Sequence, residues 1–438
     1  MISQLSHTLI LLIASIIFAV APADSEPVSR LINHHPGGAA TSEIIEPDTA
    51  FSRPVATLPS SALPHFTAGA TLFYTRWVAR PAKRPALEGL GPLFNALSCE
   101  QCHRNDGRGR PPKDNLTEAE VTGTVVKFPL GSQNYGLQLQ DRAVRGLKPE
   151  GQLQRRILSK EEFYADGQKV VLFYPSWAIT SFEIAPPPQS YSVRTAPAIF
   201  GLGLLEAIPE QRLHSLADPD DKNNDGISGR LGIGRFGWRA KQTSLLQQTA
   251  HALINDMGIS SDLYPSAFGD CTINQKKCHM LAGTGLEADT KFLQTVTDYV
   301  ANLGPPPRSG EPENFKAGQN LFHSLNCHGC HTPSHKTGEH RLTWLSGHKI
   351  WPYTDLLLHD MGDGLADGGG REWRTPPLWG LGRHKAVNGN SFYLHDGRAL
   401  TLEQAVLWHG GEAESSRENF KKLSASERTA LIDFLESL

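Results

Sequence analysis

Two pentapeptides in this chain combine a pair of cysteines with a following histidine. They are Cys99-Glu100-Gln101-Cys102-His103 and Cys327-His328-Gly329-Cys330-His331. At this spacing the two thiols can form thioethers with the vinyl groups of one porphyrin, and the histidine lies under the ring where a nitrogen can bind iron. The pattern therefore predicts two covalently bound c-type haems. Their attachment and iron-binding residues would be Cys99, Cys102 and His103 for the first haem, and Cys327, Cys330 and His331 for the second.

Closely spaced cysteines also occur in disulfides, in thioredoxin-like redox pairs and in zinc sites. A zinc site would need both Cys-x-x-Cys pairs to converge on one metal ion, and it does not explain why a histidine follows each pair. The chain has 6 cysteines and 18 histidines, too few for two copies of the pattern to arise readily by chance.

The N-terminus is typical of an exported protein. Residues 9–20 are apolar apart from Ser15, about 12 residues, which is too short to span a membrane permanently. Alanines at positions 19, 21 and 23 offer cleavage sites after Ala21 or Ala23. The first seven residues carry no Lys or Arg, so a retained membrane anchor is the alternative. We expect a periplasmic or otherwise exported protein with no stable membrane span after signal cleavage.

Composition narrows the remaining classes. The formal net charge of −3 gives no electrostatic footprint for nucleic acid. With 438 residues, the chain is long enough for two or three domains. Cys271 and Cys278 remain after the haem motifs, close together in a polar loop. In an oxidising compartment a disulfide is the default for such a pair, and a metal-binding or reactive pair is the alternative.

The haem motifs also suggest how the chain is organised. We expect a mainly α fold with two cytochrome c-like haem domains, the first enlarged by insertions that include a small β hairpin or sheet. The run Gly304-Pro305-Pro306-Pro307 is the clearest linker. The predicted divisions are a signal peptide at 1–23, an N-terminal arm at 24–64, a first haem domain at 65–305 and a C-terminal haem domain at 306–438.

Hydrophobic periodicity predicts the elements that deliver each motif. Apolar residues at helical spacing precede both motifs, over residues 90–97 and 315–325. Further helices are expected at 245–257 and 288–303, and a capping-box pattern at Ser424 to Glu427 predicts the last helix. β-Branched and aromatic runs predict strands at residues 121–128 and 170–174.

A short sequence motif occurs once in each half of the chain. Arg194-Thr195-Ala196-Pro197 is matched by Arg374-Thr375-Pro376-Pro377, and both segments follow their haem motif. Arginines placed in this way could pair with haem propionates through bidentate, charge-assisted contacts, so Arg194 and Arg374 are predicted cofactor-binding residues. An Arg-Thr-Pro turn used only to reverse the chain is the alternative.

Several other stretches resemble one protein family. They are Gly91-Pro92-Leu93-Phe94-Asn95, the run from Gly201 to Glu210, Gly234-Arg235-Phe236-Gly237-Trp238, and the segment from Leu394 to Glu412. These stretches resemble the bacterial di-haem oxidoreductase (putative peroxidase) family. The chain is more distantly similar to di-haem cytochrome c peroxidases and to MauG-type enzymes that oxidise a partner protein. The resemblance implies haem chemistry driven by peroxide, with one haem reacting and the other handling electrons.

Two unlike iron sites would then be required. A helix beginning after Thr401 places Leu402, Ala405 and His409 on one stripe, so His409 should face the interior. In the peroxidases that this chain resembles, the corresponding position is a methionine bound to the electron-transfer haem. Histidine here suggests ligation of the second haem by His331 and His409 and a lower potential. A hydrogen-bonded core histidine is the alternative role, and Met361 is the rival ligand.

No comparable sixth ligand is evident for the first haem, as expected for a site that peroxide must enter. Cleaving the O–O bond needs a group that moves a proton. Glu206, in an apolar run after Arg194, is the catalytic candidate, because burial there would raise its pKa. A helix-starting or ion-paired glutamate is the alternative. Trp177 and Trp373 are candidate electron relays between the haems.

Residues 221–227 reproduce the first half of a calcium loop. Asp221, Asn223 and Asp225 supply oxygens at positions 1, 3 and 5, and glycine follows at position 6. Gly232 stands where the bidentate Glu is expected. Related di-haem peroxidases hold calcium between their haem domains, but an Asx-rich turn without metal explains the residues nearly as well.

The sequence thus predicts an exported di-haem enzyme that reduces hydrogen peroxide, or a similar small oxidant, at the first haem. A small electron-donor protein such as a cytochrome or cupredoxin would supply electrons through the second haem. A pure electron-transfer cytochrome and an oxidase of a protein or thiol partner are the alternatives.

Overall fold

The computed structural model describes residues 34–438 except 44–45, 85–86, 114–121, 183 and 284. Three helices pack beside the first haem motif, α1 (Leu63–Tyr74), α5 (Leu245–Met257) and α7 (Thr290–Asn302). A Cβ on Gly69 would collide with the backbone of α7, so glycine permits the close approach of α1 and α7. The first motif forms the short helix α2 (Cys99–Cys102) against this group.

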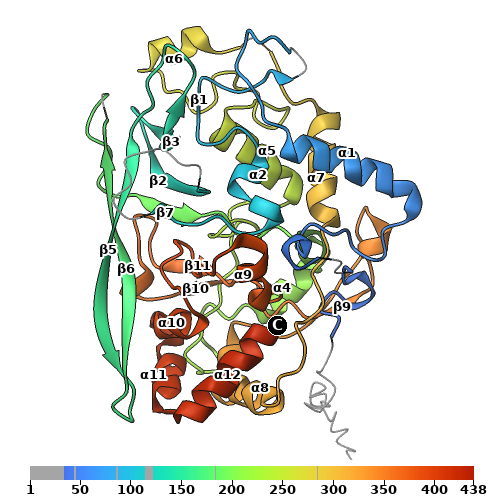
Figure 1. The fold of residues 1–438 in the computed structure, drawn as a ribbon, viewed down its shortest axis with the longest axis vertical. Coiled ribbons are helices and arrows are strands. Elements are labelled where there is room, and N and C mark those ends of the chain that lie inside the picture. The colour runs from blue at the N-terminus through green and yellow to red at the C-terminus, as the bar shows by residue number, and fades with distance from the viewer. Residues whose placement is uncertain (1–33, 44–45, 85–86, 114–121, 183, 284) are drawn as a thin grey trace, which may run out of the picture. The chain divides into compact units, whose positions relative to one another are not determined.

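Two small sheets and one long hairpin are formed by strands on either side of the first motif in the sequence. Strands β3 (Gly136–Gln138), β2 (Thr124–Ser132) and β7 (Ser192–Thr195) form an antiparallel sheet in that order. A second pair joins β1 (Leu93–Phe94) to β4 (Arg142–Ala143). Strands β5 (Gln152–Phe163) and β6 (Lys169–Thr180) pair along their whole length, and Figure 1 shows this hairpin beside α10 and α11.

The second motif lies in a helical region. Helix α8 (Phe315–Ser324) delivers it and packs on α12 (Ala425–Ser437), where a Cβ on Gly318 would collide with the carbonyl of Ala430. Shorter helices complete the region. They include α10, the helix predicted to begin after Thr401 and to place His409. They are α9 (His384–Asn388), α10 (Leu402–Leu407) and α11 (Glu414–Lys422).

The remaining elements are short and connect these parts. They are α3 (Leu202–Glu206), α4 (Glu210–Leu216), α6 (Lys276–Leu281), β8 (His335–Lys336), β9 (Lys349–Ile350), β10 (Leu358–Asp360) and β11 (Glu372–Arg374). A disulfide joins Cys271 to Cys278, as expected. Among the described residues, no helix has the length and apolar character needed to cross a membrane.

The expected elements are largely confirmed. The predicted helices at 245–257 and 288–303 match α5 and α7, and the capping box at Ser424 and Glu427 starts α12. The helix predicted over residues 90–97 is wrong. Gly91 and Pro92 disfavour a helix there, and Leu93–Phe94 instead pair with β4.

The fold class is mixed rather than mainly α, because strands and small hairpins accompany the helices. The described part of the predicted strand at 121–128 falls in β2, whereas residues 170–174 lie in β6, so the two runs belong to different sheets. Two cytochrome c-like domains and the boundaries at 64 and 305 stay predictions. The signal peptide at 1–23 lies outside the described residues.

Candidate functional site

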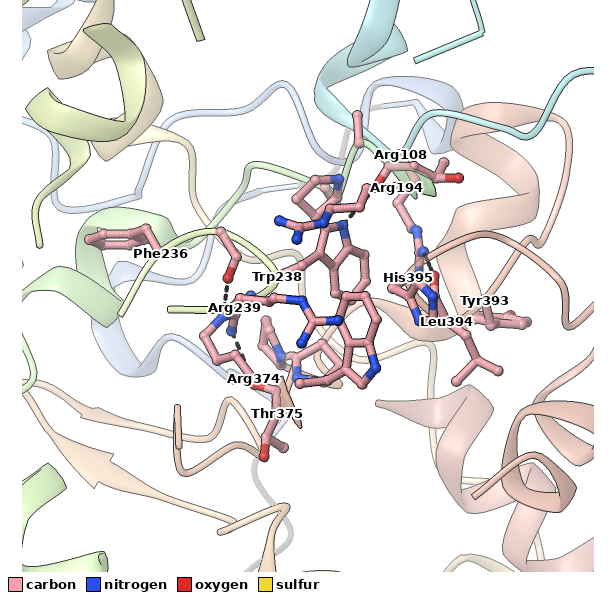
Figure 2. A pocket seen from close by; sticks show the side chains of 18 of the residues that line it. Arg108, Arg194, Phe236, Trp238, Arg239, Arg374, Thr375, Tyr393, Leu394 and His395 are labelled. Atoms are coloured by element: carbon pink, nitrogen blue, oxygen red, sulfur yellow. Dashed lines mark hydrogen bonds between the residues drawn. The ribbon is translucent and has the colours of Figure 1, made fainter. Parts of the chain in front are cut away.

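One cavity of about 590 Å³ brings the two pentapeptides together. Its lining includes both cysteines and the histidine of each motif, and also His409, Arg194 and Arg374. The sequence separates the two motifs by more than two hundred residues, yet they face the same space. Figure 2 shows a cationic and aromatic part of this lining.

The first motif presents one specific nitrogen of its histidine. His103 Nδ1 donates a hydrogen bond of 2.8 Å to the carbonyl of Pro197, which leaves Nε2 free to bind a metal. Burial lowers the pKa of His103 and so keeps the imidazole in the neutral form that binds metals. Burial also raises the pKa of the Cys99 thiol to about 12. The motif therefore fits a haem whose iron is held from this side.

The second motif repeats this arrangement and adds a second histidine. His331 Nδ1 donates to the carbonyl of Tyr353 at 3.1 Å, and His409 Nδ1 donates to the carbonyl of Ala405 at 2.7 Å. The pKa of His331 falls to about 4, first because the ring is buried and second because His409 is near. Both Nε2 atoms are thus free, and the pair fits an iron ligated by two histidines. Met361 also lines the cavity and stays the rival ligand.

Arg194 and Arg374, the arginines of the repeated motif, lie near strand ends on the cavity wall. Arg374, on β11, donates to the carbonyls of Gly237 and Thr375, and Arg194, on β7, donates through Nε to Ser192 Oγ at 2.9 Å. Burial lowers the pKa of each guanidinium to about 10. Neither has a carboxylate partner among the described residues, so both remain available for an anionic group.

Sequence reasoning missed four further cations on this wall. Arg108, Lys127, Arg239 and Lys241 also line the cavity. Of these, Arg239 pairs with Asp367 at 2.6 Å, whereas the other three have no carboxylate partner in the described part of the chain. Arg239 is buried and Arg108 and Lys127 are partly buried, whereas Lys241 is exposed. Cations withdrawn from water need counter-charge. The propionates of two haems would supply it, which is a second respect in which the cavity fits this cofactor.

Two tryptophans lie among these cations. Trp373 stacks on His395 with ring centroids 3.6 Å apart, and the guanidinium of Arg239 lies 3.9 Å from its ring centroid. Trp238, labelled in Figure 2, donates from Nε1 to the carbonyl of Thr195 at 2.8 Å. Both tryptophans line the cavity, and a relay role for Trp373 stays a prediction. Trp177 packs on the β2–β7 sheet instead and does not line the cavity.

Glu206 does not line the cavity. Its carboxylate accepts hydrogen bonds from the backbone N–H of Leu245, at 2.7 Å, and from His340 Nε2, at 3.1 Å. Burial alone would raise the pKa of Glu206, but these partners together with the charges of His340 and Arg341 lower it. The expected raised pKa is therefore wrong, and the side chain is a hydrogen-bonded carboxylate at the start of α5.

His251, a partly buried histidine on α5, lines the cavity, whereas Glu206 does not. His251 has no side-chain hydrogen bond to any described residue. Its pKa is lowered to about 3, first by burial and then by the charges of Lys127, Arg194 and Lys241. His251 is therefore a neutral imidazole at pH 7. The sequence offered no local signal for it, because the cations around it come from β2, β7 and a loop.

A buried cluster of charges lies against the second motif. His359 donates from Nε2 to Asp355 at 2.8 Å and from Nδ1 to Glu412 at 2.7 Å, and Nδ1 lies 3.5 Å from Cys330 Sγ. The side chains of His359 and Asp355 are each 2% exposed. Burial would lower the pKa of His359, but these hydrogen bonds raise it to about 12, so the imidazole is a cation.

The predicted calcium loop folds on its own backbone. Asp221 Oδ1 accepts from the N–H of Asp225 at 3.0 Å, and Asp225 Oδ1 accepts from Ile227 at 2.9 Å. Asn223 Oδ1 likewise accepts from Asp225. In the described part of the chain, no group of three or more His, Cys, Asp or Glu side chains is placed to hold a metal ion. Calcium at Asp221, Asn223 and Asp225 stays a prediction.

Comparison with known proteins supports the haem assignment. No curated protein matches this sequence. A chain of Kuenenia stuttgartiensis hydrazine synthase, from a structure pressurised with xenon, covers 98% of this chain and 99% of its own length at 13% identity and a TM-score of 0.38. A family model described as "Di-haem oxidoreductase, putative peroxidase" matches residues 33–125 and 189–438. With two Cys-x-x-Cys-His motifs at one cation-lined cavity, the chain belongs to this di-haem oxidoreductase family.

Proposed function

We propose that this protein is an exported c-type di-haem peroxidase. Thioethers at Cys99 and Cys102, and at Cys327 and Cys330, would attach the two haems. The observation that carries the proposal is the difference between the two iron sites. His331 has His409 beside it with a free Nε2, whereas no histidine of the described residues acts on His103, and His251 lines the shared cavity with no backbone carbonyl to orient its imidazole.

The haem bound at His103 would supply the iron that binds hydrogen peroxide and the electrons that break the O–O bond. The net reaction consumes two electrons and two protons for each peroxide and releases two waters. His251 is our choice for moving one proton. Haem propionates paired with Lys127, Arg194 and Lys241 would offset the charges that lower its pKa, so that its imidazole could accept a proton from peroxide and return it to the leaving oxygen. Glu206 is replaced by His251 in this role.

The other residues would hold the cofactors and carry electrons. Arg194 and Arg374 would pair with propionates, and electrons could pass through the Trp373 and Trp238 rings, which line the same cavity as both motifs. A small donor protein, such as a cytochrome or cupredoxin, would deliver electrons to the second haem. That haem, ligated by two imidazoles, would be closed to peroxide.

Intact-mass analysis and peroxide titration test this function. The secreted protein should carry the added mass of two haems, and hydrogen peroxide should change the spectrum of one of them. The His251→Ala variant should keep both haems and lose at least roughly a hundredfold in peroxide turnover, the scale of general acid–base catalysis. A protein without added haem, or a spectrum that peroxide leaves unchanged, would rule the function out.

One observation favours a second function. His251 is itself an imidazole without a hydrogen bond to any described residue in the cavity, and such a group can ligate iron. If it occupies the sixth position of the first haem, both irons are closed and the protein is an electron-transfer cytochrome. Replacing His251 with Ala would then convert the first haem from low spin to high spin. Under the peroxidase proposal that haem is already high spin and stays so.

A further inference from the structure

His409 lies just beyond the C-terminal end of the short helix α10, whose two faces are covered differently. Helix α10 spans only Leu402–Leu407, too short to hold its position without tertiary contacts. Its inner stripe, Leu402, Ala405, Val406 and His409, lines the cavity. Its outer face carries Glu403, Gln404 and Trp408. The position of His409 therefore depends on what covers that outer face.

The β5–β6 hairpin covers it. Tyr174 meets the Trp408 ring edge-on at 6.1 Å, and the ammonium of Lys160 lies 4.6 Å from the same ring centroid. Gln404 Nε2 donates to the carbonyl of Val171 at 3.2 Å. Trp408 is only 7% exposed and directly precedes His409. Figure 1 shows the hairpin running past this helix.

The tip of the hairpin is fastened to the same helical region. Tyr164 Oη donates to Glu403 at 2.6 Å, and the N–H of Ala165 donates to the carbonyl of Lys421 at 2.9 Å. Arg428, on α12, donates to Asp166 at 2.9 Å and lies with its guanidinium 3.8 Å from the Tyr164 ring centroid. The hairpin is therefore attached at both its middle and its end.

We infer that the β5–β6 hairpin is a clasp that holds His409 at the iron of the second haem. Residues 152–180 precede the second motif by more than a hundred positions, so an early segment of the chain sets the coordination of the later haem. The inference rests on the proposed ligation by His409. Tyr174, Lys160 and Tyr164 are positioning residues, because they act through Trp408 and Glu403 and do not line the cavity.

Competition between His409 and added imidazole measures this effect. Imidazole can bind the second iron only when His409 has left, so loosening the clasp lowers the apparent dissociation constant of imidazole at that haem. The double variant Lys160→Ala/Tyr174→Ala removes the two hairpin side chains that contact the Trp408 ring, while the Arg398 guanidinium stays 4.8 Å from its centroid. It should lower this constant roughly tenfold. Tyr164→Phe, which keeps the ring and removes one hydroxyl, should lower it by roughly threefold to tenfold. Electron paramagnetic resonance of the ferric holoprotein assigns the signals to each haem.

Three controls separate the clasp from general damage. Tyr174→Phe keeps the ring and should behave as wild type, as should Arg156→Ala at an exposed position of the same hairpin. Imidazole binding at the first haem should be the same in every variant. If His409→Ala converts the second haem to high spin but the hairpin variants leave imidazole binding unchanged, the clasp is wrong and the ligand assignment stands. If His409→Ala leaves the second haem low spin, both are wrong.

Discussion

The buried charge cluster beside the second motif allows a quantitative prediction. Replacing His359 with Leu removes the cation that lies between Asp355 and Glu412. Both carboxylates then lose a hydrogen-bond donor and their counter-charge. Breaking a buried ion pair by removing one partner typically costs about 3–5 kcal/mol. Glu412 keeps hydrogen bonds from Ser228, at 2.7 and 3.1 Å, so we expect the lower end, about 3 kcal/mol.

That cost converts to a modest shift in melting temperature. At the usual unfolding entropy per residue, a chain of 438 residues loses about 1 °C per kcal/mol, so the midpoint should fall by about 3 °C. Differential scanning calorimetry measures the midpoint, and denaturant unfolding measures the free energy. The double variant His359→Leu/Asp355→Asn completes a mutant cycle. Once the histidine is gone, Asp355→Asn should cost about 1–3 kcal/mol less than it does in the wild type, because it then removes an unpaired charge.

The cluster also predicts how stability depends on pH. Hydrogen bonds to Asp355 and Glu412 outweigh burial and raise the pKa of His359 above its usual 6.5, so its contribution is complete below pH 6.5 and is lost as pH rises through the raised pKa. The pKa of Glu412 is lowered from 4.5 to about 2, because hydrogen bonds from His359 and Ser228 outweigh burial. Its contribution is present above pH 4.5 and is lost as pH falls through 2. His359→Leu should flatten the acid and alkaline limbs of the curve of unfolding free energy against pH. The charge-pairing argument would be refuted if the free-energy costs of His359→Leu and Asp355→Asn were additive in the double variant and the pH dependence of stability were unchanged.

Three further predictions concern the other sites. Glu206→Gln should lower the unfolding free energy by about 1 kcal/mol, because charge-assisted hydrogen bonds are lost. Peroxide turnover in steady-state assays should stay within about twofold of wild type. A hundredfold loss of turnover would show that Glu206 is a catalytic residue after all. Cys271→Ser should lower the unfolding free energy by about 2–3 kcal/mol in denaturant titration, and no change would show that the disulfide does not stabilise the fold. Calcium should be retained at Asp221 and Asp225 after dialysis in elemental analysis and lost in Asp221→Ala/Asp225→Ala, whereas equal content in both proteins would remove that site.

Local patterns made several features predictable from the sequence. The two Cys-x-x-Cys-His motifs, the α8 helix and the disulfide each depend on residues close together in the chain. The placement of His409 followed from helical spacing alone, since Leu402 and Ala405 share its stripe towards the cavity. Such features need only the geometry of a single helix or loop.

Non-local contacts made other features unpredictable. The carbonyls of Pro197 and Tyr353, which select the metal-binding nitrogen of each motif histidine, lie far from those motifs in the sequence. Lys127 reaches the cavity only because β2 pairs with β7 in one register. Glu206 follows an apolar run, as expected for a buried residue, but the partner that sets its pKa, His340, comes from a distant loop.

Electron paramagnetic resonance of the ferric protein tests the central claim most directly, because it counts and types both irons at once. The account predicts one low-spin haem with two imidazole ligands and one high-spin haem, with only the high-spin signal changed by hydrogen peroxide. Two low-spin signals that peroxide does not alter would contradict it.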